Sequence, residues 1–372
     1  MTYTSDHKKY MRKALFLAQK GLGRTSPNPP VGAVIVKSGQ VIGEGYHRKA
    51  GEPHAEVEAI RNCSESSKDA TIYVTLEPCN HRGRTGPCTE AILNAGITEV
   101  FIGANDPNPD VKGSGADYLR KQGVTVYEKL LEKECKEILR FFATSIQKKR
   151  PYVIYKAAAS LDGKTATSAE ESQWITSEAA RRDVHKLRDH VDAILVGKHT
   201  FLKDNPRLTA RIPGKKVQNP LRIILNPDLS FPKDCNLLEV LPLNQTVFFY
   251  DPERITESQI KKTMAFGFQV KPLIKGTKST ISQILTFLHE EGITSLLLEG
   301  GATTAWNFYQ EELIDEQVLY LAPKIIGGIT APGVISGQGF QQLSTVPTLN
   351  DVTIKQIGCD VRITGKVKYT NQ

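Results

Sequence analysis

The sequence predicts an α/β protein with two domains. A chain of 372 residues is longer than one hydrophobic core usually supports. Short apolar runs typical of strands alternate with amphipathic segments along the whole chain, which is the pattern of an α/β layer fold. The basic cluster from Lys148 to Arg150 interrupts this pattern, and a fresh alternation starts after it. We therefore expect domains at residues 1–147 and 148–372.

Each element of the first domain is predicted by its own hydrophobic pattern. Apolar residues at helical spacing favour helices, whereas short runs rich in Val, Ile and Tyr favour strands. In chain order the expected elements are a helix at 11–23, a strand at 31–36, a helix at 53–62, a strand at 71–76, a helix after 88, a strand at 99–104, a helix at 115–123, a strand at 124–128 and a helix at 130–147. Pro53 suits a helix start, so we expect His54 in a first helical turn.

The second domain repeats the alternation with more strongly apolar strands. After the segment 152–164, we expect strands at 192–197, 221–226 and 246–250, a helix at 281–292, a strand at 294–301, a helix from 302 and a strand at 317–328. Apolar runs of this length between helices indicate largely parallel strands that are buried on both faces.

Composition and charge narrow the class of protein. A hydrophobic content of 40% with 24% charged residues is ordinary for a globular chain, and no segment has the roughly 18 apolar residues of a membrane span. Six cysteines are too sparse for a disulfide framework, and no segment resembles a secretion signal, so we expect reduced thiols and a cytoplasmic location. The net charge of +8 comes from dispersed basic residues without interleaved aromatics. A small phosphorylated ligand explains this positive charge as well as nucleic acid does, no membrane partner is expected, and a homo-oligomer stays open.

Three residues in the first domain have the chemistry of zinc ligands. Cys79 and Cys88 are joined by an unusually long loop, "CNHRGRTGPC", and His54 lies upstream in "PHAEVEAI". One histidine and two thiolates leave the fourth tetrahedral position open for water, whereas a structural zinc site is normally closed by four protein ligands. The set therefore indicates a catalytic zinc.

Glu56, two residues after His54, completes the signature of a zinc deaminase. In that signature H-x-E precedes P-C and a second cysteine, and Pro78-Cys79 supplies the P-C. Zinc lowers the pKa of its water, the resulting hydroxide attacks a carbon that bears an amino group, and the glutamate protonates the departing ammonia. Residues two apart do not share a helix face, so Glu56 is expected to reach the water from the side rather than to bind the metal.

Other interpretations of these residues remain open from the sequence. A single His or Cys is usually a packed core residue, and a Glu near a helix start is usually a surface charge. A zinc-stabilised scaffold would need a fourth protein ligand, which the motif lacks. A nucleic-acid base deaminase would share the zinc chemistry and use the positive charge, but it leaves the second half unexplained.

The first half resembles a known enzyme family. The segments "GRTSPNPPVGAVIV", "GYHRKAGEPHAE", "TLEPCNHRGRTGPC" and "DPNP" are similar to the deaminase half of the bifunctional deaminase/reductases of riboflavin biosynthesis. The resemblance implies a cytidine-deaminase-like three-layer domain, with Asn28, His47 and Arg84 holding the pyrimidine and its ribose phosphate. The family usually has two prolines before the second cysteine, where this chain has Gly86-Pro87.

The second half lacks the G-x-G-x-x-G pattern of an ordinary dinucleotide fold. A buried strand instead runs into Glu299, Gly300 and Gly301, and the helix expected from Ala302 would aim free backbone N–H groups at an anion. A strand, a glycine pair and a helix start also occur together as a simple turn.

The surrounding segments of the second half extend the family resemblance. "KAAASLDGKTA" and "ESQWITSEAARRDVHKLRDHVDAILVGKHTFLKDNPRLTAR" are similar to the reductase half of the same enzymes, a dihydrofolate-reductase-like α/β fold that uses NADPH. The resemblance implies that NADPH contacts Ala158, Trp174, Thr200, Asp204 and Gly301, and that the substrate contacts Ser172, Arg188, Leu208, Arg211 and Glu299. Without it, Arg188 would be expected on a charged helix face and Trp174 in a core.

The resemblance implies two consecutive reactions on one small molecule. The first is zinc-dependent deamination of a diaminopyrimidine ribosylamino phosphate, and the second is NADPH-dependent reduction of its ribosyl group to ribityl. The sequence does not single out the proton donor of the reduction, for which Lys156, Asp204 and Glu299 are polar candidates. Loss of activity in one half is not excluded by intact motifs.

Overall fold

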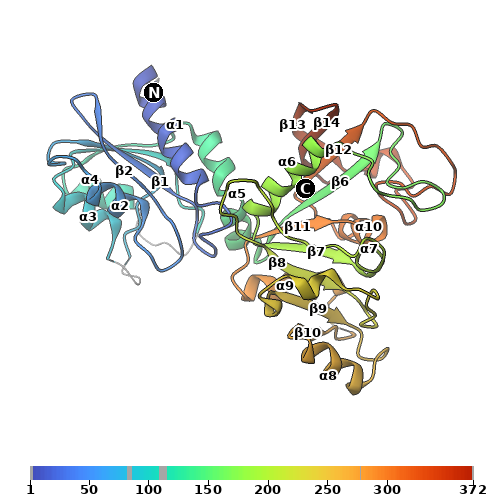
Figure 1. Ribbon diagram of the computed structural model, residues 1–372. Helices are drawn as coiled ribbons and strands as arrows, with labels where there is room; N and C mark the ends of the chain where they lie inside the picture. The colour runs from blue at the N-terminus through green and yellow to red at the C-terminus, as the bar shows by residue number, and fades with distance from the viewer. Residues whose placement is uncertain (1–2, 82–85, 109–114, 277, 371–372) are drawn as a thin grey trace. The chain divides into compact units, whose positions relative to one another are not determined.

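The computed structural model describes residues 3–81, 86–108, 115–276 and 278–370 of the chain (Figure 1). These residues form two compact units, Met1–Arg150 and Pro151–Gln372, called the first and the second unit below. Within the described residues, we find no helix that is both long and apolar enough to cross a membrane.

The first unit contains a five-stranded sheet with the strand order β2-β1-β3-β4-β5. Its strands are β1 (Gly32–Lys37), β2 (Gln40–Tyr46), β3 (Thr71–Leu76), β4 (Glu99–Ala104) and β5 (Thr125–Tyr127). Strand β1 is antiparallel to β2 and β3, whereas β3, β4 and β5 are parallel. The four strands expected from the sequence are confirmed, and β2 is an additional strand.

Helices cover both faces of this sheet, which gives three layers (Figure 1). They are α1 (Ser5–Gln19), α2 (Ala55–Arg61), α3 (Cys88–Asn94), α4 (Gly115–Lys121) and α5 (Glu132–Lys148). Glycines set how closely helices approach the strands. A Cβ on Gly32 would lie 2.0 Å from the Ala14 carbonyl oxygen of α1, and a Cβ on Gly45 would lie 2.3 Å from the Ala59 nitrogen of α2. Because Gly45 pairs with Ala33, the neighbour of Gly32, the two glycines face opposite sides of the sheet.

The second unit contains a nine-stranded sheet in the order β10-β9-β8-β7-β11-β6-β12-β14-β13. Its strands are β6 (Tyr152–Ser160), β7 (Ala193–Gly197), β8 (Leu221–Leu225), β9 (Thr246–Tyr250), β10 (Gln269–Pro272), β11 (Ser295–Glu299), β12 (Glu316–Ala322), β13 (Thr348–Ile357) and β14 (Asp360–Lys368). The seven strands from β10 to β12 are parallel, and β14 and β13 join antiparallel at one edge.

Most central strands of this sheet are buried on both faces, as the sequence predicts. The helices are α6 (Glu178–His190), α7 (Lys198–Asp204), α8 (Glu257–Ala265), α9 (Thr280–Glu290) and α10 (Ala302–Gln310). Val247 and Phe249 of β9 belong to the core that also contains Ile284 of α9. Phe248, between them, points to the other face, where its ring centroid lies 5.5 Å from that of Phe201 in α7. Parallel β7 and β11 lie side by side, so their carboxyl ends meet at one edge.

Candidate active sites

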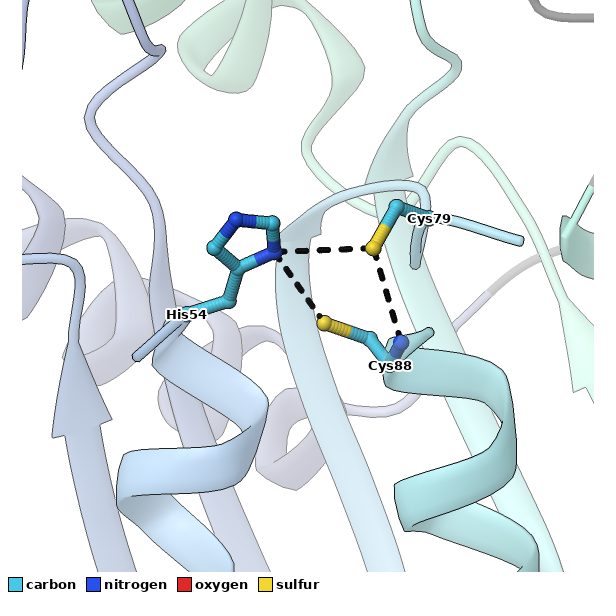
Figure 2. Close-up of side chains that lie close together, drawn as sticks. All are labelled: His54, Cys79 and Cys88. Carbon is cyan, nitrogen blue, oxygen red and sulfur yellow. Dashed lines mark hydrogen bonds between the residues drawn. The ribbon is translucent and has the colours of Figure 1, made fainter. Parts of the chain in front are cut away.

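His54 stands at the start of α2, one position earlier than the sequence predicts. The expectation of a first-turn residue is wrong, because the helix begins at Ala55 and His54 is its N-cap with φ −72° and ψ 165°. An N-cap residue has extended rather than helical backbone angles, so its side chain leaves the helix end instead of lying along its surface. This geometry directs the imidazole toward two cysteines (Figure 2).

The two cysteines come from the end of a strand and the start of a helix. Cys79 follows β3, and Cys88 is the first residue of α3. The Nδ1 atom of His54 lies 3.3 Å from Cys88 Sγ and 3.5 Å from Cys79 Sγ, and the Cys88 backbone N–H donates to Cys79 Sγ over 3.4 Å (Figure 2). The three ligand atoms all lie within 4.8 Å of one another. One imidazole and two thiols converging at this distance fit a zinc ion with one open position.

Electrostatics in this cluster favour binding of a cation. Hydrogen bonds from the Cys88 thiol and from His54 lower the pKa of Cys79, which favours the thiolate form of this residue. The hydrogen bond to Cys79 and burial raise the pKa of Cys88. Cys88 is also at a helix N-terminus, where the partial positive charge of the backbone stabilises an anionic sulfur. The ligand set therefore carries negative charge that a metal dication would neutralise.

Glu56 is buried beside the cluster but is not part of it. Only 3% of Glu56 is exposed, and burial together with the Cys79 thiolate raises its pKa to about 7. Glu56, His54 and Cys79 line one cavity of about 480 Å³. A carboxyl with this pKa can hold and release a proton at the cavity wall near neutral pH.

Asn28 and His47 lie in the same cavity wall and hydrogen-bond to each other. The carbonyl oxygen of Pro53 lies 3.0 Å from His47 Nδ1, and since a carbonyl only accepts, that nitrogen carries the proton. Burial lowers the pKa of His47, so its Nε2 is an acceptor for the Asn28 amide nitrogen at 3.1 Å. This arrangement fixes the orientation of the Asn28 amide. Arg84 lies outside the described residues.

Several cavity residues were missed by the sequence analysis. Asp106 and Asn108 belong to the "DPNP" segment, and Phe142 and Ile146 come from α5. The sequence patterns around these residues were not distinctive, because a Pro-rich loop resembles any turn and the apolar face of an amphipathic helix normally faces a core. Among the described residues, five separate segments of the first unit therefore line the cavity.

A buried ion-pair network forms the candidate reductase site in the second unit. Arg188 of α6 donates two hydrogen bonds to Glu299 at the end of β11, with distances of 2.7 and 2.9 Å. Lys156 of β6 lies 3.7 Å from the same carboxylate. Burial alone would raise the pKa of Glu299, but the charges of Arg188 and Lys156 outweigh it and lower the pKa to about 2. Glu299 is therefore a fixed carboxylate.

The segment 207–211 brings Leu208 and Arg211 to this network. Arg188 donates to the Thr209 carbonyl over 3.1 Å, and Arg211 donates to the Thr209 hydroxyl over 2.7 Å. Leu208 precedes Thr209 and is 2% exposed. The sequence analysis did not identify Thr209, because a threonine in a loop carries no distinctive signal.

The predicted NADPH residues fall into separate groups. Ser172 donates to Asp204 over 3.3 Å, and Lys156 exerts an electrostatic effect on Asp204, which links these residues to the Glu299 network. Trp174 is 62% exposed and stacks with Arg181, whose guanidinium carbon lies 4.5 Å from the ring centroid. The core position expected for Trp174 without the resemblance is therefore wrong. Ala158 lies in β6 opposite Tyr320 of β12.

The glycine pair after β11 has the geometry of a phosphate-binding turn. Gly300 and Gly301 have φ values of 106° and 73°, in the region that favours glycine. A Cβ on Gly300 would lie 2.9 Å from the side chain of Thr200, so no other residue fits there without displacement. Gly301 is the N-cap of α10, whose first backbone N–H groups are free to bind an anion. These residues fit a dinucleotide pyrophosphate.

Comparisons with known proteins agree with both sites. The family model for the cytidine and deoxycytidylate deaminase zinc-binding region matches residues 4–104, and the model for the RibD C-terminal domain matches residues 151–363. The chain is 43% identical over 355 residues to riboflavin biosynthesis protein RibD of Bacillus amyloliquefaciens, with 95% of each chain covered. The chain belongs to the RibD family.

Solved structures support the RibD family fold over both units. A deaminase/reductase from Thermotoga maritima has a TM-score of 0.85 and 37% identity, with 98% of this chain and 99% of that chain covered. RibD of Acinetobacter baumannii has a TM-score of 0.84 and 34% identity over the same shares. The predicted fold class is confirmed, with a cytidine-deaminase-like domain followed by a dihydrofolate-reductase-like domain. As a RibD family member, the chain is a bifunctional deaminase and reductase of riboflavin biosynthesis that uses zinc and NADPH.

Proposed function

We propose that residues 1–147 deaminate 2,5-diamino-6-(5-phosphoribosylamino)pyrimidin-4-one and that residues 148–372 reduce the ribosyl group of the resulting uracil compound. The observation that carries the deaminase assignment is one cavity holding His54, Cys79 and Glu56, with Cys88 completing the ligand set. The substrate identity comes from the family and from the Thermotoga maritima relative, which is described as a deaminase and reductase of these compounds.

In the deaminase, each residue has a separate task. His54, Cys79 and Cys88 would hold zinc, which supplies a Lewis acid that makes water nucleophilic near neutral pH. Glu56 takes a proton at the cavity wall and delivers it to the leaving ammonia. Asn28, oriented by neutral His47, presents its amide to the edge of the pyrimidine, and Arg84 binds the phosphate.

In the reductase, the chain mainly orients two reactants. NADPH supplies the hydride. The Gly301 helix start, Thr200 and Trp174 would hold the cofactor, and Ala158 and Asp204 would complete its site. Arg188 and Glu299 form one wall of the substrate site with Ser172 and Leu208, and Arg211 binds the phosphate as a planar guanidinium suited to oxyanions.

Of the three candidate donors of the proton needed for the reduction, Lys156 and Asp204 remain. Glu299 is held as a carboxylate by its cationic neighbours, so it is a poor proton donor in this state. Lys156 carries protons on Nζ, although burial lowers its pKa, and burial raises the pKa of Asp204. We assign the proton to this pair.

The partners we propose are a small phosphorylated pyrimidine, zinc and NADPH, without nucleic acid. The enzyme acts in the cytoplasm, and all six cysteines are free, as suits a reducing compartment. Steeply salt-dependent binding to RNA or single-stranded DNA would instead favour a nucleic-acid base deaminase, because phosphate contacts release counterions.

The deciding experiment follows NADPH oxidation by the zinc-loaded protein. The diaminopyrimidine phosphate and the already deaminated uracil phosphate are supplied in parallel. Oxidation with both compounds supports the two-step proposal. Oxidation with only the deaminated compound refutes the deaminase assignment, and no oxidation with either refutes the reductase assignment.

A further inference from the structure

His185 lies in the candidate reductase site, and no role has been assigned to it so far. It is on α6, three residues before Arg188, so the two side chains share a helix face. The Nδ1 atom of His185 lies 3.1 Å from the Thr209 carbonyl oxygen, which also accepts from Arg188 over 3.1 Å. Because a carbonyl only accepts, His185 Nδ1 carries the proton. Two donors from α6 therefore converge on one backbone oxygen.

The backbone around Thr209 needs such anchors. Leu208 has φ 52°, a left-handed conformation that is sterically unfavourable for an L residue. The next amide, that of Ala210, donates to Asn219 Oδ1 over 3.0 Å. Neighbouring groups therefore hold this segment in its conformation, and His185 provides one of those contacts.

Arg211 is hydrogen-bonded to the side chain of Thr209. The Thr209 hydroxyl accepts from Arg211 Nη1 over 2.7 Å, so the guanidinium is tied to the residue whose carbonyl His185 holds. A displacement of Thr209 would carry this contact with it. Bidentate recognition of an oxyanion tolerates little misalignment of the guanidinium plane.

A neutral histidine suits this position because two guanidinium groups are close by. Burial and the charges of Arg188 and Arg211 lower the pKa of His185 to about 4. A lysine here would add a third positive charge, and a carboxylate would neutralise the cations that a phosphate requires. A neutral imidazole donates the hydrogen bond and leaves the positive charge of Arg211 available.

We propose that His185 is a positioning residue for the reductase substrate, which fixes the Thr209 carbonyl and thereby orients Arg211 toward the substrate phosphate. This inference rests on the proposed function, because the phosphate role of Arg211 is part of it.

Two substitutions in the full-length, zinc-loaded protein separate the hydrogen bond from the ring. H185N retains an N–H donor near the place of Nδ1, whereas H185F retains a planar ring without a donor. With the deaminated uracil phosphate, H185F is expected to raise KM roughly tenfold, which corresponds to one lost hydrogen bond of about 1.4 kcal/mol. H185N should stay within about threefold of wild type, and the KM for NADPH should not change. A wild-type KM in H185F, or equal KM values in the two variants, would overturn the proposal.

A double-mutant cycle tests the route through Arg211. If His185 acts by orienting Arg211, H185F should raise the KM of R211Q by less than about twofold, because the orientation no longer matters. If H185F and R211Q each raised KM by its own factor and the two factors multiplied in the double variant, the proposal would be overturned. A wild-type KM in R211Q would refute the phosphate role of Arg211, and with it the proposed route, whereas absence of NADPH oxidation in the wild-type protein would refute the proposed function itself.

Folding of the variants is measured separately. Trp174 and Trp306 are the only tryptophans of the chain and both lie in the second unit, so their fluorescence reports on that unit. If H185F does not fold, H185Q replaces it, since its amide lies one bond farther from the backbone. The same rise in KM is then expected, and a wild-type KM in folded H185Q would overturn the proposal.

Discussion

Glu56 and Glu299 are both buried, yet their pKa values move in opposite directions. Burial in a low-dielectric environment raises the pKa of any carboxyl. The Cys79 thiolate adds to this effect and brings Glu56 to about 7, whereas Arg188 and Lys156 overcome it and bring Glu299 to about 2. The neighbours therefore decide that one carboxyl exchanges protons and the other remains a charged anchor.

Replacement of Glu56 by glutamine should abolish deamination and leave zinc binding and the reductase activity unchanged. Because an amide cannot exchange the proton, ammonia release should fall by about 100-fold or more. Zinc content should not change, since the three ligand atoms come from other residues, and NADPH oxidation with the deaminated compound should match wild type. Ammonia, zinc and NADPH are assayed on one preparation. Wild-type ammonia release would remove Glu56 from the mechanism.

The depressed pKa of Glu299 predicts a pH-dependent stability of the second unit. A carboxyl whose folded-state pKa is about 2, against an ordinary value of 4.5, stabilises the fold fully above pH 4.5 and loses that contribution as the pH falls toward 2. The shift corresponds to at most about 3 kcal/mol. In denaturant unfolding followed by tryptophan fluorescence, wild type should exceed E299Q in stability at pH 7, and the difference should shrink below pH 4.5. A difference that grows on acidification would contradict this assignment.

The sequence indicates residues with distinctive chemistry better than residues with ordinary chemistry. His54, Cys79 and Cys88 could be predicted because few other functions need one imidazole and two thiols, and the structure brings them together. The predicted role of His185 could not be obtained in this way. Its contribution depends on a backbone carbonyl 24 residues away in the chain, and only tertiary structure creates that contact.

At the scale of elements, the glycines of β2 determine where α2 presents His54 and Glu56. A Cβ on Gly45 would lie 2.3 Å from the Ala59 nitrogen and 2.4 Å from the Ala55 carbonyl oxygen, which are backbone atoms of α2. The helix would have to move away from the sheet, because backbone atoms cannot rotate aside.

Substitution G45A should therefore impair zinc binding although it touches no ligand. We expect a loss of stability of about 1–3 kcal/mol and at least a tenfold loss of ammonia release, with lower zinc occupancy. G86A is the matched control, because a Cβ on Gly86 would meet no atom of the described residues within 4 Å even though it lies two residues from Cys88. Equal zinc content and activity in both variants would reject the proposed role of helix placement.

The strands with continuous apolar runs, such as β7 and β11, were predicted from the sequence, whereas β2 and β13 were not. Strand β2 contains two glycines and a charged residue in "QVIGEGY", so its propensity for a strand is low. Strand β13 is exposed along almost its entire length, so it lacks the buried apolar run that identifies β11. In both strands the pairing with a neighbour, rather than local propensity, determines the structure.

At the scale of the whole molecule, the residues of the two candidate sites come from separate units. The proposed zinc ligands all belong to Met1–Arg150, and the network of Arg188, Glu299 and Lys156 belongs to Pro151–Gln372. We therefore expect that zinc is required only for deamination and NADPH only for reduction. Loss of zinc should leave the reduction intact, and loss of NADPH should leave the deamination intact.

Removal of zinc with a chelator should stop ammonia release and leave NADPH oxidation with the deaminated compound unchanged, and added zinc should restore ammonia release.

The reciprocal variant is R211E, in which a carboxylate would repel the substrate phosphate. It should raise the reductase KM by at least about 100-fold and leave ammonia release at the wild-type rate. If chelation also abolished oxidation of NADPH with the deaminated compound, the metal would be needed for the second reaction, and the independence of the two sites would be rejected. Independent responses would mean that the deaminated compound alone connects the two reactions, as product of one unit and substrate of the other.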